Sequence, residues 1–279
     1  MCQMCAEHGL GRKWYLQPRN YEASKANVAF IEEFFSHWEQ FLTKRMIEEK
    51  TGFLKELVKN HRGQVVPLED AVRIMKTAEE VYGKDFVAVA SYCGCRKAYA
   101  AEWLPVCIGW GVVLRRSSAV GYNSKIPDEW KRYKVATGFI EERPRYPLTA
   151  DSAAELMKEW EDKQGLVHAV FTFGIPYVGS ICNCETPYCV AFRDRFHQGI
   201  SELLRKGEYI GVVDPDACIG CGKCKLACQF GAINLPHLTG RAVIDPTKCF
   251  GCGVCRSFCD QRAITLVDRA KVPAARNLW

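Results

Sequence analysis

The sequence predicts an α+β protein in which a larger domain of helices and strands precedes a small, cysteine-rich module. Three observations lead to this prediction. The 279 residues suffice for about two domains. The hydrophobic share of 48% and the charged share of 25% are ordinary for a globular chain. A 23-residue segment near the C-terminus occurs twice. We therefore expect domains at 1–207 and 208–270, followed by a tail at 271–279.

The N-terminal part holds two aromatic segments. Residues 9–21 are basic and aromatic, and we expect an extended arm there. Residues 27–47 carry a helical stripe of apolar and aromatic side chains. The preferred interpretation of this stripe is a helix that packs across the domain. The alternative is a helix that docks a partner.

Two further segments share the order helix, glycine, strand and Cys-x-Cys. The first is a helix that ends at Gly83, followed by a strand over 86–90. The second is a helix opened by the capping-box pattern of Ser152 and Glu155, followed by a strand over 166–173. The repetition indicates an ancient duplication.

Each of these strands leads towards a triplet of cysteines. A Cys-x-Cys pair places two thiols on an irregular segment just past a strand end, and two such segments would meet at one edge of a sheet. The triplets are Cys93, Cys95 and Cys107, and Cys182, Cys184 and Cys189. We expect them to hold one or two further iron–sulfur clusters, with zinc or metal-free burial as alternatives. Cys2 and Cys5 either complete the ligand count, stay free or bind zinc.

The C-terminal repeat covers Val213 to Leu235 and Ile244 to Leu266, with eleven of 23 positions identical. Each copy contains Cys-x2-Cys-x2-Cys-x3-Cys. Three cysteines at this spacing let a looping backbone wrap one face of an iron–sulfur cube, and the glycines between them permit close approach. The fourth cysteine begins a short helical stretch and points away from its own loop. Short strands on both sides of each loop predict two halves related by a pseudo-twofold axis, held together largely by the clusters.

These motifs resemble the bacterial two-[4Fe–4S] ferredoxin family, in which the fourth cysteine ligates the other repeat's cluster. The resemblance implies two ligand sets. One set is Cys218, Cys221, Cys224 and Cys259, and the other is Cys249, Cys252, Cys255 and Cys228. The duplicated spacing disfavours the alternative of two zinc sites. The family has proline after the fourth cysteine, whereas this chain has Gln229 and Asp260, a departure that bears on reduction potential and local rigidity.

The N-terminal motifs are CxCR at 93–96, GLVH at 165–168 and ICNC at 181–184. Placed ahead of the repeat, they resemble multi-cluster ferredoxin-type proteins of anaerobes. The resemblance implies further iron–sulfur character and a place in anaerobic metabolism, without implying a reaction.

The cysteines also bear on the compartment and the charge. The chain has sixteen of them, no apolar run long enough to cross a bilayer and no signal-peptide pattern at its start. We therefore expect a cytoplasmic protein without a membrane span, in which clustered cysteines bind metal rather than form disulfides. The formal net charge of +6 treats thiols as neutral. Two oxidised clusters would lower it to about +2, so the charge does not favour nucleic acid as a partner.

Basic residues near the C-terminal cysteines predict docking to acidic surfaces of redox partner proteins. They are Lys223, Lys225, Lys248, Arg256 and Arg262. The predicted function is the transfer of single electrons through at least two [4Fe–4S] clusters. The alternative is an iron–sulfur oxidoreductase, or its subunit, with a catalytic cluster in the N-terminal domain. We predict an electron carrier or a subunit rather than a stand-alone enzyme, and we assign no catalytic residue.

His168 and the terminal pair Cys2 and Cys5 each allow more than one interpretation. His168 lies within the second predicted strand, and we interpret it as a hydrogen-bonded core residue. In the oxidoreductase alternative it would be a non-cysteine ligand or a proton donor. A third class of function is a redox or metal sensor in which Cys2 and Cys5 respond to oxidation.

Overall fold

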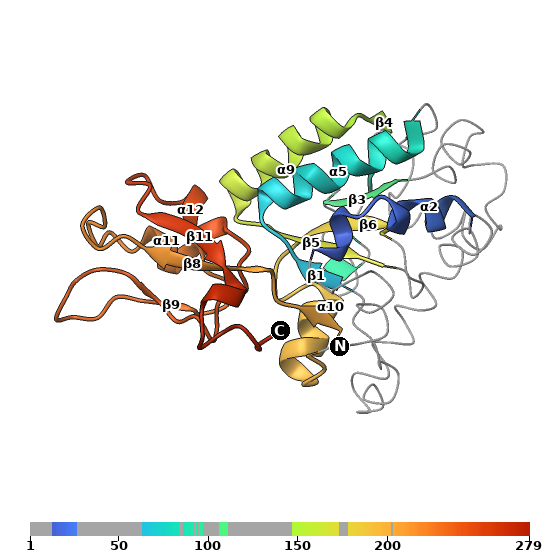
Figure 1. Cartoon of the computed structure of the whole chain (residues 1–279). Helices are drawn as coiled ribbons and strands as arrows, with labels where there is room; N and C mark the ends of the chain where they lie inside the picture. The colour runs from blue at the N-terminus through green and yellow to red at the C-terminus, as the bar shows by residue number, and fades with distance from the viewer. Residues whose placement is uncertain are drawn as a thin grey trace.

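Figure 1 shows the computed structural model of the chain, which confirms the predicted α+β class. The structure describes residues 13–26, 63–83, 86, 88–91, 93, 95–96, 106–110, 147–172, 178–201 and 203–279. The helix predicted over 27–47 and the terminal Cys2 and Cys5 lie outside these residues.

The larger part of the fold is built on a seven-stranded sheet with the order β4-β2-β3-β6-β5-β1-β7. Neighbouring strands are antiparallel except for β1 and β7, which run parallel. The strands are β1 (Gly63–Val65), β2 (Ala88–Ser91), β3 (Cys107–Trp110), β4 (Pro147–Leu148), β5 (Val167–Phe171), β6 (Ser180–Cys184) and β7 (Leu204–Arg205).

Helices α5 (Leu68–Tyr82) and α9 (Ala150–Gln164) lie side by side on one face of this sheet (Figure 1). Met75 of α5, Met157 of α9 and Ile181 of β6 are fully buried in one core. Burial of a side chain of this size contributes about 1.5–3 kcal/mol. The layer of two helices on the sheet therefore provides a core that does not depend on metal.

The start of α9 corrects the predicted capping box. Thr149 is the N-cap, and its Oγ1 accepts a hydrogen bond from the Ser152 N–H at 3.1 Å. The Thr149 N–H in turn donates to Ser152 Oγ at 2.9 Å. Ser152 therefore closes the box instead of opening it, and the helix begins one turn earlier than the predicted pair implied.

The topology supports the predicted duplication and corrects its alignment. The units β1-α5-β2-β3 and β4-α9-β5-β6 have the same order of elements, and β3 pairs with β6 at the centre of the sheet. Each unit places its first strand beside the other unit, because β1 pairs with β5 and β4 with β2. The two Cys-x-Cys motifs are not equivalent positions, since the first follows β2 whereas the second lies in β6.

Helix α10 (Val190–His197) covers the opposite face of the sheet (Figure 1). Alternate residues of β5 divide between the two faces, as side chains of a strand do. Val167 and Ala169 pack with Phe192 of α10, whereas Val170 joins the core under α5 and α9.

The expected N-terminal arm is instead part of the core. Its described residues form η1 (Trp14–Leu16) and the start of α2 (Arg19–Ala26). Trp14, Tyr15 and Tyr21 are fully buried, and Trp14 Nε1 donates to Gln64 Oε1 of β1 at 2.7 Å. The aromatic side chains therefore pack against the sheet and α5 instead of extending from them.

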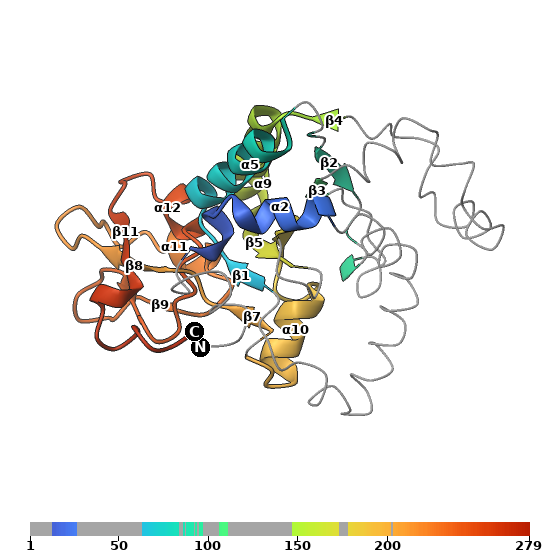
Figure 2. The same ribbon diagram turned by 45° about the vertical axis from the view of Figure 1, so that its right-hand side comes forward.

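The C-terminal module lies beside α9 in both views (Figures 1 and 2). Strand β8 (Tyr209–Val213) pairs antiparallel with β11 (Ile264–Asp268), and β9 (Ile233–Asn234) with β10 (Val243–Ile244). Each pair joins one repeat to the other, as the predicted pseudo-twofold arrangement requires. Cys228 and Cys259 follow the short helices α11 (Lys223–Ala227) and α12 (Val254–Ser257) and do not begin them.

The residues after β11 fold back on the molecule through η4 (Arg269–Lys271). Ala275 is fully buried, and Arg195 of α10 donates to the Trp279 carbonyl at 2.8 Å. Residues 271–279 are thus packed against both parts of the chain. Among the helices that the structure describes, none has the length and apolarity that crossing a membrane requires.

Candidate metal centres

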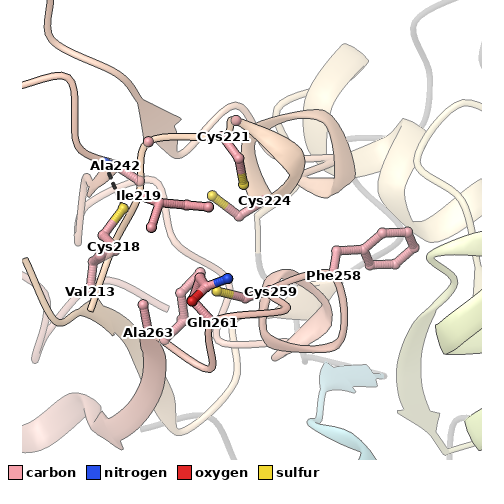
Figure 3. Close-up of a pocket in the computed structure, with 13 residues that line it drawn as sticks. Val213, Cys218, Ile219, Cys221, Cys224, Ala242, Phe258, Cys259, Gln261 and Ala263 are labelled. Carbon is pink, nitrogen blue, oxygen red and sulfur yellow. Dashed lines mark hydrogen bonds between the residues drawn. The ribbon is translucent and has the colours of Figure 1, made fainter.

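Four cysteines from both repeats line one pocket of the C-terminal module (Figure 3). Cys218 and Cys221 lie in the loop between β8 and α11, and Cys224 lies in α11. Cys259 comes from the other repeat, just after α12. The remaining wall is mainly apolar and includes Val213, Ile219, Ala242, Phe258, Ala263 and Ile264. A pocket of this composition suits a group that binds through sulfur.

The other four cysteines of the module also gather. Burial raises the pKa of the Cys255 thiol to about 12, and the nearby Cys249 and Cys228 thiols add to the effect. Burial also raises the pKa of Cys252 well above its usual value, with Cys255, Cys249 and Cys228 close by. Thiolates packed in this way need positive charge beside them, which a metal supplies.

Two glycines let the backbone follow the shape of these loops. Gly220 and Gly251 have φ of +71° and +70°, and a Cβ on either would lie 2.0 and 2.1 Å from a backbone oxygen. The Gly251 and Gly211 N–H groups point at Cys249 Sγ at 3.4 and 3.5 Å, and the Ala242 N–H points at Cys218 Sγ at 3.4 Å. Such N–H donors stabilise anionic sulfur ligands.

The arrangement fits an iron–sulfur cluster better than a single ion. The four ligands of a four-iron cube bind four different irons, so they need not converge on one point. Thiol donors, N–H groups aimed at sulfur and an apolar wall are together what a cluster of this kind requires.

Several of the basic residues expected to attract an acidic partner are already paired within the chain. Lys223 Nζ lies 2.5 Å from Asp260 Oδ2, and Arg256 Nη2 lies 2.6 Å from Glu69 Oε1 of α5. Asp260 is one of the two residues that stand where the ferredoxin family has proline. Its pairing with Lys223 lowers the net positive charge available for steering a partner.

Gln229, the other such residue, joins the module to the N-terminal domain. Its Nε2 donates to the Gly165 carbonyl at 2.7 Å and lies 3.5 Å from the Cys184 carbonyl. Its Oε1 accepts from the Thr186 N–H at 2.8 Å. Proline could make none of these side-chain bonds. The departure from the family pattern was visible in the sequence, but the hydrogen-bond partners of Gln229 were not.

Replacing Gln229 with alanine is expected to loosen this junction without loss of metal. Each lost hydrogen bond is worth about 1 kcal/mol, and the Thr186 amide should exchange its hydrogen markedly faster. Hydrogen–deuterium exchange of the holoprotein, read at residues 184–186, measures the effect. Asn234→Ala, at an exposed amide of β9, is the control. Unchanged exchange at Thr186 in the Gln229 variant would contradict this role.

Of the six N-terminal cysteines of the two triplets, three lie in the central strands β3 and β6, and the other three lie outside the strands. Cys182 and Cys184 are inside β6, and Cys107 of β3 is the register partner of Cys182. Cys93 and Cys95 follow β2, which pairs with β3, and Cys189 is the N-cap of α10. The first Cys-x-Cys follows a strand end, as expected, although Cys95 is helical, whereas the second lies within a strand.

His168 lies on the other face of the sheet from Cys182 and Cys184, as the alternation of β5 and β6 requires. It is fully buried, and its Nδ1 lies 2.6 Å from Asn183 Oδ1. Its Nε2 lies 3.2 Å from Glu161 Oε2 of α9. This placement supports the interpretation of His168 as a core residue and weighs against a role as a ligand to these thiols.

Two arginines, one beside each group of cysteines, were not singled out from the sequence. Arg96 pairs with Glu185 and lies over the Tyr188 ring at 4.8 Å, which ties the first Cys-x-Cys to the segment after the second. The CxCR motif was a signal for this role. Arg269 is fully buried and donates to the Cys249 carbonyl at 2.9 Å, and no local pattern marks it.

Comparison with known proteins places the repeat in a family. Residues 212–234 and 242–265 match the 4Fe–4S binding domain. The protein is also similar to the B subunit of the anaerobic dimethyl sulfoxide reductase of Escherichia coli (strain K12) and of Shigella flexneri. Each is 33% identical over 76 residues, which are 26% of this chain and 33% of the relative. The chain thus matches about a third of the length of these relatives, and the C-terminal region carries the 4Fe–4S binding repeats.

Proposed function

We propose that the chain is an iron–sulfur electron-transfer protein that passes single electrons between redox partner proteins. The observation that carries this proposal is the gathering of four cysteines, drawn from both 4Fe–4S binding repeats, around one pocket. The similarity to one subunit of a reductase supports a role beside a partner protein. A cluster bound there supplies one-electron chemistry without bond breaking.

The proposed ligand sets are those implied by the ferredoxin resemblance. Cys218, Cys221, Cys224 and Cys259 would hold one [4Fe–4S] cluster, and Cys249, Cys252, Cys255 and Cys228 the other. In the structure burial and the nearby thiols of Cys259, Cys218 and Cys221 raise the pKa of Cys224. Burial and the thiols of Cys255, Cys249 and Cys228 raise the pKa of Cys252. Cys224 also lies near Cys255 of the other set, so the main support for the crossed assignment is the pocket that Cys259 shares with Cys218, Cys221 and Cys224.

The surrounding residues have three tasks in this proposal. N–H groups of Gly251, Gly211 and Ala242 stabilise ligand sulfur, and the apolar wall keeps water away. The exposed Ile219 and Leu226 and the basic Lys225 and Arg262 near the ligands provide a docking surface for a partner with acidic groups. We place this module at 208–270 and the protein in a reducing compartment, the cytoplasm, where clustered cysteines bind metal rather than form disulfides.

Crossed ligation predicts that Cys259→Ser and Cys221→Ser damage the same cluster. Each variant should lose up to about four irons per chain or convert that cluster to a three-iron form. Anaerobic iron and sulfide analysis with EPR after dithionite reduction measures this. Cys252→Ser is the comparison, and its altered signal should belong to the other cluster. If Cys259→Ser instead reproduced the Cys252→Ser spectrum, the crossed assignment would be wrong.

The alternative of an oxidoreductase with a catalytic cluster in the N-terminal domain retains one supporting observation. The six thiols around β3 and β6 exceed the four that one cube needs. A substrate-dependent change in an EPR signal lost from Cys182→Ser would favour that alternative over an electron carrier. No change with any candidate substrate, together with reversible one-electron reduction, would favour the carrier.

A further inference from the structure

Three cysteines share one face of the central sheet. Side chains two apart on a strand point to the same face, so Cys182 and Cys184 of β6 do. Cys107 lies directly opposite Cys182 on β3 and shares that face as well. It is the face covered by α10, because Cys182 and Cys184 pack in the cluster that contains Phe192.

The other three cysteines come to the same place from outside the strands. The Cys93 thiol is within hydrogen-bonding reach of Cys107 and Cys95. The Cys184 thiol is within hydrogen-bonding reach of Cys189. Cys107 and Cys182 are register partners within hydrogen-bonding reach of one another, and Cys95 lies near Cys189. The six thiols therefore form a closed circuit, contributed by three separate stretches of the protein.

The circuit is enclosed and held in place. Cys93, Cys184 and Cys189 are only 6, 5 and 5% exposed. The Arg96 N–H points at Cys93 Sγ at 3.4 Å, and the Val190 N–H reaches Cys95. Both contacts repeat the N–H-to-sulfur pattern of the C-terminal module. The ion pair of Arg96 with Glu185 holds the segment after the first Cys-x-Cys against the segment after the second.

We propose that these six cysteines form a third iron–sulfur site, in which four of them ligate one [4Fe–4S] cluster. The soft thiol donors suit iron–sulfur or zinc. Thiols spread around a circuit suit an extended cube, whose four irons each take a different ligand, better than a single zinc ion. Without metal, three buried and three half-buried cysteines would leave a ring of mutually facing thiols.

The site lies next to the second C-terminal ligand set. Cys252 packs against the same apolar cluster as Cys182, together with Phe230 and Phe250, whose rings stack at 4.1 Å. Gln229 follows Cys228 directly, and its Nε2 lies 3.5 Å from the Cys184 carbonyl. The third site is thus placed beside the proposed electron-transfer module. The inference uses the proposed function only for this neighbouring role.

The test uses the full chain, assembled with iron and purified without oxygen. Iron, sulfide and zinc analysis with ⁵⁷Fe Mössbauer spectroscopy should give about twelve irons per chain, all in [4Fe–4S] form. The double variant Cys182→Ser, Cys184→Ser should retain about eight. Thr186→Ala, in the same segment, keeps its backbone N–H and should retain all of them.

Three results would overturn the proposal. They are zinc in place of the third cluster, iron content unchanged by the double variant, and six reactive thiols in the folded, anaerobic protein. A second double variant, Cys218→Ser with Cys221→Ser, separates this proposal from the proposed function. It should lose a C-terminal cluster and retain the third. Iron lost only with Cys182 and Cys184 would refute the C-terminal clusters while supporting the third site.

Discussion

Removal of iron is expected to unfold the C-terminal module while the seven-stranded sheet and its two helices stay folded. The core of the module is small and consists partly of cysteines. The buried members of its own cluster are Cys218, Cys224, Ile233, Ala242, Ala263 and Ile264, whereas Phe250 and Val254 pack into the cluster that contains Phe192 of α10. Strands β9 and β10 contribute two residues each. A core of this size cannot hold a fold without a metal.

Hydrogen–deuterium exchange before and after anaerobic oxidation and chelation measures this effect. The Asp214 N–H, bonded to the Ala263 carbonyl at 2.7 Å between the halves, should lose its protection. The Val66 N–H, bonded to the His168 carbonyl at 3.0 Å in the core of the seven-stranded sheet, is the internal control and should stay protected. Reconstitution with iron and sulfide should restore protection of the Asp214 amide. Equal protection of both amides after iron loss would contradict a metal-dependent core.

The parts of the structure that the sequence predicted well depend on local signals. Strand β8 occupies Tyr209–Val213, the segment expected from the position of the cysteine loop. Helices α5 and α9 end before Gly83 and Gly165, as predicted, because a glycine at the helix end accepts the backbone conformation that stops the helix. These signals act over a few residues and need no knowledge of the rest of the chain.

The parts that it did not predict depend on pairing between distant segments. Cys182 lies inside a strand because β6 pairs with β3, where Cys107 is its partner. Nothing near Cys182 reveals that partner. The buried Trp14 likewise depends on Gln64, which is distant in the sequence. The cysteines of the C-terminal repeat were easier to place because their spacing within one loop already reflects the shape of the group they bind.

The C-terminal region depends on one buried cation as well as on metal. Arg269 is fully buried in η4, and its guanidinium donates to the carbonyls of Gly207 at 2.6 Å, Cys249 at 2.9 Å and Tyr209 at 3.1 Å. These carbonyls belong to the connection between the domains, to the second cysteine loop and to β8. A further bond to the Leu278 carbonyl at 3.2 Å joins the C-terminal segment to the same point.

Arg269→Met is therefore expected to destabilise the holoprotein by about 3 kcal/mol or more, because it leaves several buried carbonyls without a donor. The measurement is thermal unfolding of the anaerobic, iron-loaded protein, followed by loss of cluster absorbance. Arg276→Met, at an exposed position of the same segment, is the matched control and should change stability by less than about 0.5 kcal/mol. Since Arg269 holds the Cys249 carbonyl, cluster loss and unfolding of β8 should coincide in the variant. A variant as stable as Arg276→Met would show that the carbonyls find other donors and that the metal alone organises this region.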